Sequence, residues 1–174
     1  MEISLEGKVA LVTGASRGIG KAIAQAYADA GASVLLSSRK LPDLEAAAAE
    51  IGGDVDVIAA NAGDPTQAEA AVDFCVERFG AVDILVNNAA TNPYMGPTMD
   101  IDLPRYDKTW EVNLRGALVW TQLAWRRSMA ERGGNVINIA SVGGLSVEPA
   151  IGIYNATKAA LLHLTRTHAA ELAP

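Results

Sequence analysis

A regular alternation of short apolar runs with longer helical stretches is the feature that most constrains the fold of this chain. The apolar runs are rich in β-branched residues and stop at turn-forming residues, which predicts buried strands. The expected strands cover residues 8–12, 33–37, 55–59, 82–86 and 135–139. The expected helices cover residues 19–30, 43–51, 65–79 and 102–131, with a last helix that reaches toward residue 172. Such alternation implies right-handed crossovers, so we expect one doubly wound, parallel α/β domain over residues 1–174.

One of these helices has a specific start signal. Asp64 is expected as its N-cap residue, Pro65 occupies the first helical position, and Gln67 is placed for a capping box. The helix is therefore expected to begin directly after Asp64.

Composition limits the partners and the compartment. The 174 residues carry a formal net charge of −6, which argues against nucleic acid or an anionic membrane as a partner. The single cysteine, Cys75, excludes an internal disulfide and is expected to be a buried apolar residue rather than a catalytic thiol. The start does not resemble a signal peptide, and no uncharged apolar stretch has membrane-spanning length. We therefore expect a cytoplasmic protein.

A glycine-rich turn follows the first expected strand. Gly14, Gly18 and Gly20 have the spacing G-x-x-x-G-x-G, and a helix follows them. A turn in this position offers free backbone N–H groups and the positive helix end to a pyrophosphate. A P-loop is excluded, because it needs glycine at Ala15 and a hydroxyl residue at Ala22. Taken alone, the motif is also compatible with a turn made only for close helix packing.

Two residues near the end of the chain indicate carbonyl chemistry. Tyr154 and Lys158 are four positions apart, so on a helix they share one face, and Ser141 lies thirteen positions before the tyrosine. An ammonium beside the phenol favours its ionised form. Lowering a tyrosine pKa from about 10 to about 7 requires roughly 4 kcal/mol, more than one solvated charge supplies. A second positive charge is therefore expected, and an oxidised nicotinamide ring would provide it.

These residues give the chain a resemblance to the short-chain dehydrogenase/reductase family, from about residue 5 to the last residue. The matching motifs are Thr13-Gly14-Ala15-Ser16-Arg17-Gly18-Ile19-Gly20, Asn87-Asn88-Ala89-Ala90, Asn113, Ser141 and Tyr154-x-x-x-Lys158. The family's usual Asn-Asn-Ala-Gly ends here in Ala90. Segments 37–40 and 88–93 are most similar to carbonyl and retinal reductases, and less specifically to 3-oxoacyl-carrier-protein reductases. The resemblance implies a Rossmann fold.

The resemblance also implies a catalytic set of four residues. Tyr154 would be the general acid in carbonyl reduction and the base in alcohol oxidation. Lys158 would also bond the nicotinamide ribose, and Ser141 would donate a hydrogen bond to the substrate oxygen. Asn113 would hold a water that links Lys158 to solvent. Residues 92–95 are expected to line the substrate pocket, and their mix fits aliphatic, aromatic or acyl carbonyls.

The expected cofactor is NADP, with NAD possible. Arg39 and Lys40 follow the second strand after Ser38, and no carboxylate is expected there to repel a 2′-phosphate. Arg17 is a second candidate for binding that phosphate, and Asn61 would accept a hydrogen bond from the adenine amino group. The expected cofactor contacts are Gly14, Ser16, Arg17, Gly18, Ile19, Gly20, Ser38, Arg39, Lys40, Asn61, Ala62, Asn88, Ala89, Ala90, Tyr154 and Lys158.

No metal site is expected. His163 and His168 are five positions apart on a helix, so they point about 140° apart, and neither has Cys or His partners. Trp110, Trp120 and Trp125 are expected in the core or at subunit contacts.

By resemblance, the long helix and the last helix would pack against a neighbouring subunit in a homo-oligomer, a dimer or a tetramer. Leu161, Leu162 and Leu164 suit that contact.

Members of the family continue beyond the position of Pro174 into a sixth strand, a segment that covers the substrate and a seventh strand. We therefore expect a sheet without its C-terminal strands, in a truncated product or a fragment, and a chain prone to aggregate. Two functions remain open: an NADP-dependent oxidoreductase acting on a carbonyl or secondary alcohol, and a catalytically weak nucleotide-binding or assembly subunit.

Overall fold

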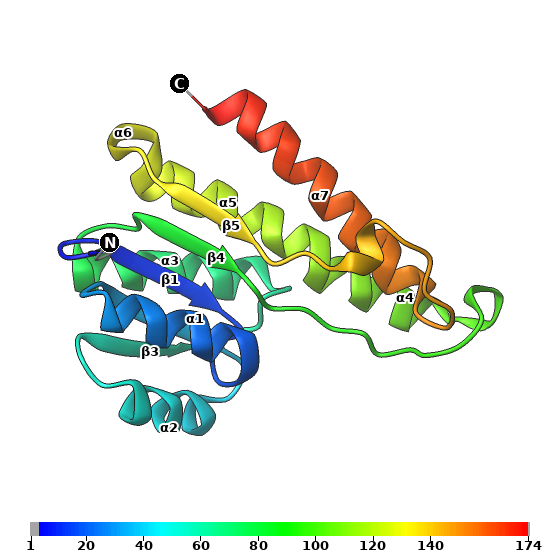
Figure 1. Cartoon of the computed structure of the whole chain (residues 1–174), viewed down its shortest axis with the longest axis horizontal. Coiled ribbons are helices and arrows are strands. Elements are labelled where there is room, and N and C mark those ends of the chain that lie inside the picture. The colour runs from blue at the N-terminus through cyan, green and yellow to red at the C-terminus, as the bar shows by residue number, and fades with distance from the viewer. Residues whose placement is uncertain (1–3, 174) are drawn as a thin grey trace.

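A single parallel sheet forms the centre of the computed structural model, which describes residues 4–173 (Figure 1). Its strand order is β3-β2-β1-β4-β5, and all four strand pairings are parallel. The predicted doubly wound α/β architecture is therefore confirmed. The strands are β1 (Val9–Thr13), β2 (Ser33–Ser38), β3 (Val55–Ala59), β4 (Ile84–Asn87) and β5 (Asn135–Asn138).

The helices follow the predicted order but differ in the middle of the chain. The expected long helix over residues 102–131 is interrupted by two π-helical segments, Glu111–Gly116 and Trp125–Met129. Such wide turns are local insertions into an α-helix and occur frequently at functional sites. The α-helices are α1 (Gly18–Asp29), α2 (Leu41–Ile51), α3 (Pro65–Phe79), α4 (Leu103–Trp110), α5 (Ala117–Ala124), α6 (Ala130–Arg132) and α7 (Gly152–Leu172).

The start of α3 confirms one half of its predicted cap. The Asp64 carboxylate accepts hydrogen bonds from the backbone N–H groups of Thr66 and Gln67, as an N-cap residue does. The predicted capping box is wrong, because the Gln67 amide oxygen accepts from the backbone N–H of Asn61 instead of from Asp64. This bond fixes the loop that leads from β3 into the helix.

The two faces of the sheet bury separate hydrophobic clusters, because successive side chains of a strand point to opposite faces. Leu11, Leu35 and Leu85 pack with residues of α3 and α5 on one face. Val12 and Leu36 pack with residues of α1 and α2 on the other face. Figure 1 shows these helices on opposite sides of the sheet. Both layers thus hold the strand ends in place.

Several residues singled out in the sequence belong to this core. Cys75 is fully buried, and desolvation, together with the nearby Asp83 charge, raises its pKa to about 12, so it is no nucleophile. Trp120 is buried as well, and its indole N–H donates to the Ala62 carbonyl. Leu161 is only 1% exposed, so the expectation that it contacts another subunit is wrong. It faces inward, into a small cavity that Trp120 also lines.

The topology defines one edge of the sheet as the place for a ligand. The chain leaves β1 toward β2 on one side and returns after β3 to β4 on the other side. At this switch point the connections diverge and leave a crevice beyond the carboxyl ends of β1 and β4. Within residues 4–173, no helix is both long and apolar enough to cross a membrane.

Candidate functional site

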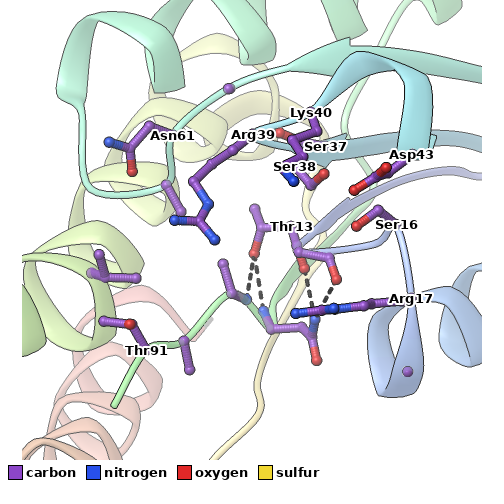
Figure 2. Close-up of a pocket in the computed structure, with 18 of the residues that line it drawn as sticks. Thr13, Ser16, Arg17, Ser37, Ser38, Arg39, Lys40, Asp43, Asn61 and Thr91 are labelled. Carbon is purple, nitrogen blue, oxygen red and sulfur yellow. Dashed lines mark hydrogen bonds between the residues drawn. The ribbon is translucent and has the colours of Figure 1, made fainter. Parts of the chain in front are cut away.

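A cavity of about 440 Å³ opens at this switch point (Figure 2). The glycine turn, the ends of β1 and β2, and the segments that follow β3 and β4 form its walls. Of the expected cofactor contacts, all line the cavity except Gly20, Tyr154 and Lys158. Gly20 packs below it, where a Cβ would stand 2.5 Å from both the Asn88 amide nitrogen and the Gly14 carbonyl.

The floor of the cavity is a hydrogen-bonded junction between the glycine turn and the segment after β4. The Thr13 hydroxyl accepts from the backbone N–H groups of Asn88 and Ala89, at 3.0 and 3.1 Å. The Asn88 amide donates to the carbonyls of Thr13 and Gly14, at 2.9 and 3.1 Å (Figure 2). Gly14 has φ +66°, and a Cβ there would meet this amide at 2.9 Å. Both the positive φ angle and the close approach of the Asn88 amide therefore require glycine at this position.

Three cations stand around one end of the cavity. Arg17 comes from the glycine turn, and Arg39 and Lys40 follow β2. Within the described part of the chain, none of the three forms an ion pair with a carboxylate. Figure 2 shows Arg39 extending into the cavity, with Arg17 on the opposite wall. This end can therefore bind phosphate.

The expectation that no carboxylate stands near this end is wrong. Asp43 lines the cavity from the first turn of α2, and Figure 2 shows it on the same rim as Ser16 and Ser38. In the sequence it lies three residues beyond the cations that follow the strand. Because α2 already begins at Leu41, its first turn brings residue 43 back to the strand end.

Asn61 lies on the wall of the cavity opposite the glycine turn. Its side-chain oxygen accepts a hydrogen bond from the backbone N–H of Gly63 at 3.2 Å. An amide oxygen has two lone pairs, so one acceptor position is left for a ligand.

The expected catalytic lysine is buried at the side of this junction. Lys158 is 3% exposed, and its ammonium donates to the Ile139 carbonyl at 2.6 Å. Burial lowers its pKa from the usual 10.5 to about 8. The same nitrogen lies 5.7 Å from the centre of the Tyr154 ring, one helical turn earlier on α7. The lysine charge thus stands next to the half-buried tyrosine, as the spacing predicted.

Ser141 follows β5, two residues after the carbonyl that binds the lysine. Its side-chain oxygen accepts from the backbone N–H of Gly143 at 3.1 Å. Because that bond uses a lone pair, the hydroxyl proton is left to donate elsewhere. Gly144 packs on the Lys158 backbone, where an added Cβ would stand 2.9 Å from its carbonyl carbon. The serine loop is thereby seated on α7.

Asn113 lies in the first π-helical segment, where it is 2% exposed. Its oxygen accepts from the Thr91 backbone N–H at 2.7 Å, and its amide donates to the Thr91 carbonyl at 2.9 Å. The amide also donates to the Thr157 hydroxyl at 3.1 Å, and that hydroxyl donates to the Tyr154 carbonyl at 2.7 Å. Asn113 therefore ties the segment after β4 to the turn of α7 that carries the tyrosine.

A second, much smaller cavity of about 10 Å³ is lined by Asn113 and Lys158 among others. Thr13 and Ala89 contribute to its wall and to the wall of the main cavity. The lysine therefore lies behind the hydrogen-bonded junction that forms the floor of the main cavity.

Several lining residues were not predicted from the sequence. Lys108 and Val112 are four positions apart on the expected long helix, so they share one face of it. The complete set is Thr13, Ser37, Asp43, Ala60, Thr91, Lys108 and Val112. Within residues 4–173, no group of three or more His, Cys, Asp or Glu side chains is placed to hold a metal ion.

The geometry agrees with the outcome of sequence comparison. The family model described as short chain dehydrogenase matches residues 8–174. The chain belongs to the short-chain dehydrogenase/reductase family. Sorbitol dehydrogenase of Cereibacter sphaeroides is 41% identical over 164 residues, which are 94% of this chain and 64% of that protein. Human dehydrogenase/reductase SDR family member 4 is 39% identical over 173 residues, which are 98% of this chain and 62% of that protein.

A solved structure shows the same fold in this family. The 3-ketoacyl-(acyl-carrier-protein) reductase of Brucella melitensis, complexed with NADH, superposes with a TM-score of 0.91 at 35% identity. The match covers 98% of this chain and 72% of that one. The chain thus spans slightly less than two thirds of the length of the curated short-chain dehydrogenases described above.

Proposed function

We propose that this chain contains the cofactor site and the catalytic residues of an NADP-dependent oxidoreductase that acts on a carbonyl or secondary alcohol. One observation carries the proposal: the main cavity lies at the switch point of the sheet and shares wall residues with the small cavity that Lys158 lines, and the Lys158 ammonium stands beside the Tyr154 ring. A crevice of this size at the switch point, close to an acid–base pair, suits a dinucleotide with its reactive ring at that pair.

The cavity walls suit each part of the dinucleotide. The N-terminus of α1 and the turn around Gly18 offer backbone N–H groups to the pyrophosphate. Arg39 and Arg17 offer guanidinium groups to a 2′-phosphate, which supports NADP over NAD. Asn61 and Ala62 would border the adenine. When bound, the reduced nicotinamide supplies the hydride for the carbonyl carbon.

Three residues of the chain would handle the proton and the developing charge. Tyr154 would donate the proton to the carbonyl oxygen, and the Ser141 hydroxyl would stabilise the charge on that oxygen. The Lys158 ammonium, with its pKa of about 8, is mostly protonated at neutral pH and would favour the ionised phenol in the reverse reaction.

Asn113 would serve this set in two ways. It positions α7 through the Thr157 hydroxyl, which is the contact described above. The small cavity beside Lys158 has the volume for a single water, so it would suit a relay between the lysine and solvent.

The cellular setting belongs to the same proposal. A fully buried free cysteine suits a reducing, cytoplasmic compartment. By analogy with the family, we also propose a homo-oligomer whose subunits contact one another through residues 102–131 and α7. Leu162 and Leu164 are half-buried and are the remaining candidates for that contact after Leu161.

Cofactor binding and turnover test the proposed function separately. Titration of the chain with NADPH, followed by nucleotide fluorescence, should give saturable binding, and a panel of ketones and aldehydes should show oxidation of NADPH. Tyr154→Phe should keep binding but retain less than about a tenth of the rate, given the usual size of general acid catalysis. Tyr27→Phe, a similar change on α1, is the matched control.

The outcomes separate the two candidate functions. Binding and turnover that depend on the Tyr154 hydroxyl support the enzyme. Saturable NADPH binding without turnover of any carbonyl supports a weak nucleotide-binding subunit instead. No binding of either nicotinamide nucleotide would exclude both.

A further inference from the structure

The end of the main cavity at which Arg17, Arg39 and Lys40 stand carries charges of both signs. Among the described residues, Asp43 is the only carboxylate that lines the cavity, and it stands on the rim that Ser16 and Ser38 share (Figure 2). Arg39 and Lys40 follow β2 immediately before the helix that carries Asp43. None of these three charged groups forms an ion pair within residues 4–173. They are all left to act on a ligand.

We propose that Asp43 is a cofactor-selectivity residue that opposes the 2′-phosphate of NADP and so reduces the preference for NADPH over NADH. The inference rests on the proposed function, because it concerns the nucleotide that the cavity binds. The two nucleotides differ only in the phosphate on the adenosine ribose. A charge on the rim at that phosphate changes one affinity and leaves the other nearly unchanged.

The physical argument is a balance of charges at one rim. Arginine binds a phosphate through two parallel N–H groups, whereas a carboxylate repels the same dianion. The hydroxyl that replaces this phosphate in NADH is neutral, and a carboxylate can accept its hydrogen bond. Asp43 is exposed, so solvent screens its charge and limits the effect. An exposed charge of this kind is expected to change affinity by about fivefold.

A purely structural role for Asp43 predicts something different. An acidic side chain in the first turn of a helix interacts favourably with the helix dipole. If that were its whole contribution, removing the charge would lower the melting temperature and leave the ratio of the two dissociation constants unchanged. The ratio therefore distinguishes selectivity from helix stabilisation.

Asp43→Asn tests the inference, because it keeps the size of the side chain and removes its charge. Dissociation constants of the 174-residue chain for NADPH and NADH are measured by fluorescence titration at low salt, with thermal melting as a check on folding. We expect NADPH to bind about fivefold more tightly and NADH to change by less than about twofold. High salt should diminish the gain.

Glu45→Gln provides the matched control. Glu45 is exposed on the same helix, two positions further along, and does not line the cavity. The substitution Glu45→Gln removes the same unit of charge from the opposite side of α2. It should therefore leave the ratio of the NADPH and NADH dissociation constants at its wild-type value. An unchanged ratio in Asp43→Asn, or an equal change in Glu45→Gln, would overturn the selectivity role while the proposed function stands. Failure of the wild type to bind either nucleotide would overturn both.

Discussion

Lys158 is a residue whose burial has a measurable consequence for stability. Its pKa falls from 10.5 to about 8 because the ammonium is desolvated. Below about pH 8 the lysine is protonated in both the folded and the unfolded chain, and the folded state bears the desolvation cost. Between about pH 8 and pH 10.5 the unfolded chain binds more protons at this residue than the folded chain does. The free energy of unfolding contributed by Lys158 therefore rises with pH across this range.

This dependence predicts a difference between the wild type and Lys158→Met. The free energy of unfolding of the wild type should increase relative to that of the variant as pH rises from about 8 to about 10.5, because only the wild type has the titrating group. Urea unfolding at several pH values measures the difference. Lys8→Met, at an exposed lysine, is the control for the loss of one charge. Parallel stability curves for the wild type and Lys158→Met would show that the ammonium is not desolvated.

At the scale of elements, one hydroxyl joins the π-helical segment Glu111–Gly116 to α7. Thr157 is fully buried, accepts from the Asn113 amide and donates to the Tyr154 carbonyl. Thr157→Val keeps the shape but leaves the Asn113 amide with one partner fewer in a buried place. We expect a loss of about 1–3 kcal/mol in the free energy of unfolding.

Two further variants check that this loss comes from the junction. Thr167→Val makes the same change on the same helix at a less buried hydroxyl, so its effect should stay within about 0.5 kcal/mol. Asn113→Ala combined with Thr157→Val should be non-additive, because each removes the same bond. Strictly additive losses in chemical denaturation would show that the two side chains do not interact.

The sequence predicted regular elements better than interrupted ones. The strands, the N-cap at Asp64 and the face shared by Tyr154 and Lys158 follow from periodicity and spacing, which are local properties. The π-helical segment around Asn113 does not, because it is defined by i→i+5 backbone hydrogen bonds and not by an apolar period. Asp43 was missed for a related reason: a shift of two residues in a helix start decides whether it faces the cavity.

At the scale of the whole molecule, the charge of the chain and the charge of the cavity have opposite signs. The formal net charge of −6 repels an anionic nucleotide at long range. The unpaired cations that line the cavity among the described residues, Arg17, Arg39 and Lys40, attract it at short range. Salt screens charges over a Debye length of about 10 Å at about 0.1 M, so both effects weaken as ionic strength rises. If the attraction dominates, added salt weakens nucleotide binding; if the repulsion dominates, added salt strengthens it.

We predict that added salt weakens NADPH binding more steeply than NADH binding, because the proposed contact of the 2′-phosphate with Arg39 would be screened by salt. Fluorescence titrations of both nucleotides across a salt series measure the two slopes. Arg39→Ala should remove most of the difference between them. Arg126→Ala, which removes an exposed arginine outside the cavity, changes the net charge equally and should leave the difference intact. Equal slopes for the two nucleotides in the wild type would place the 2′-phosphate away from Arg39, since a contact between two opposite charges at an exposed rim is sensitive to salt.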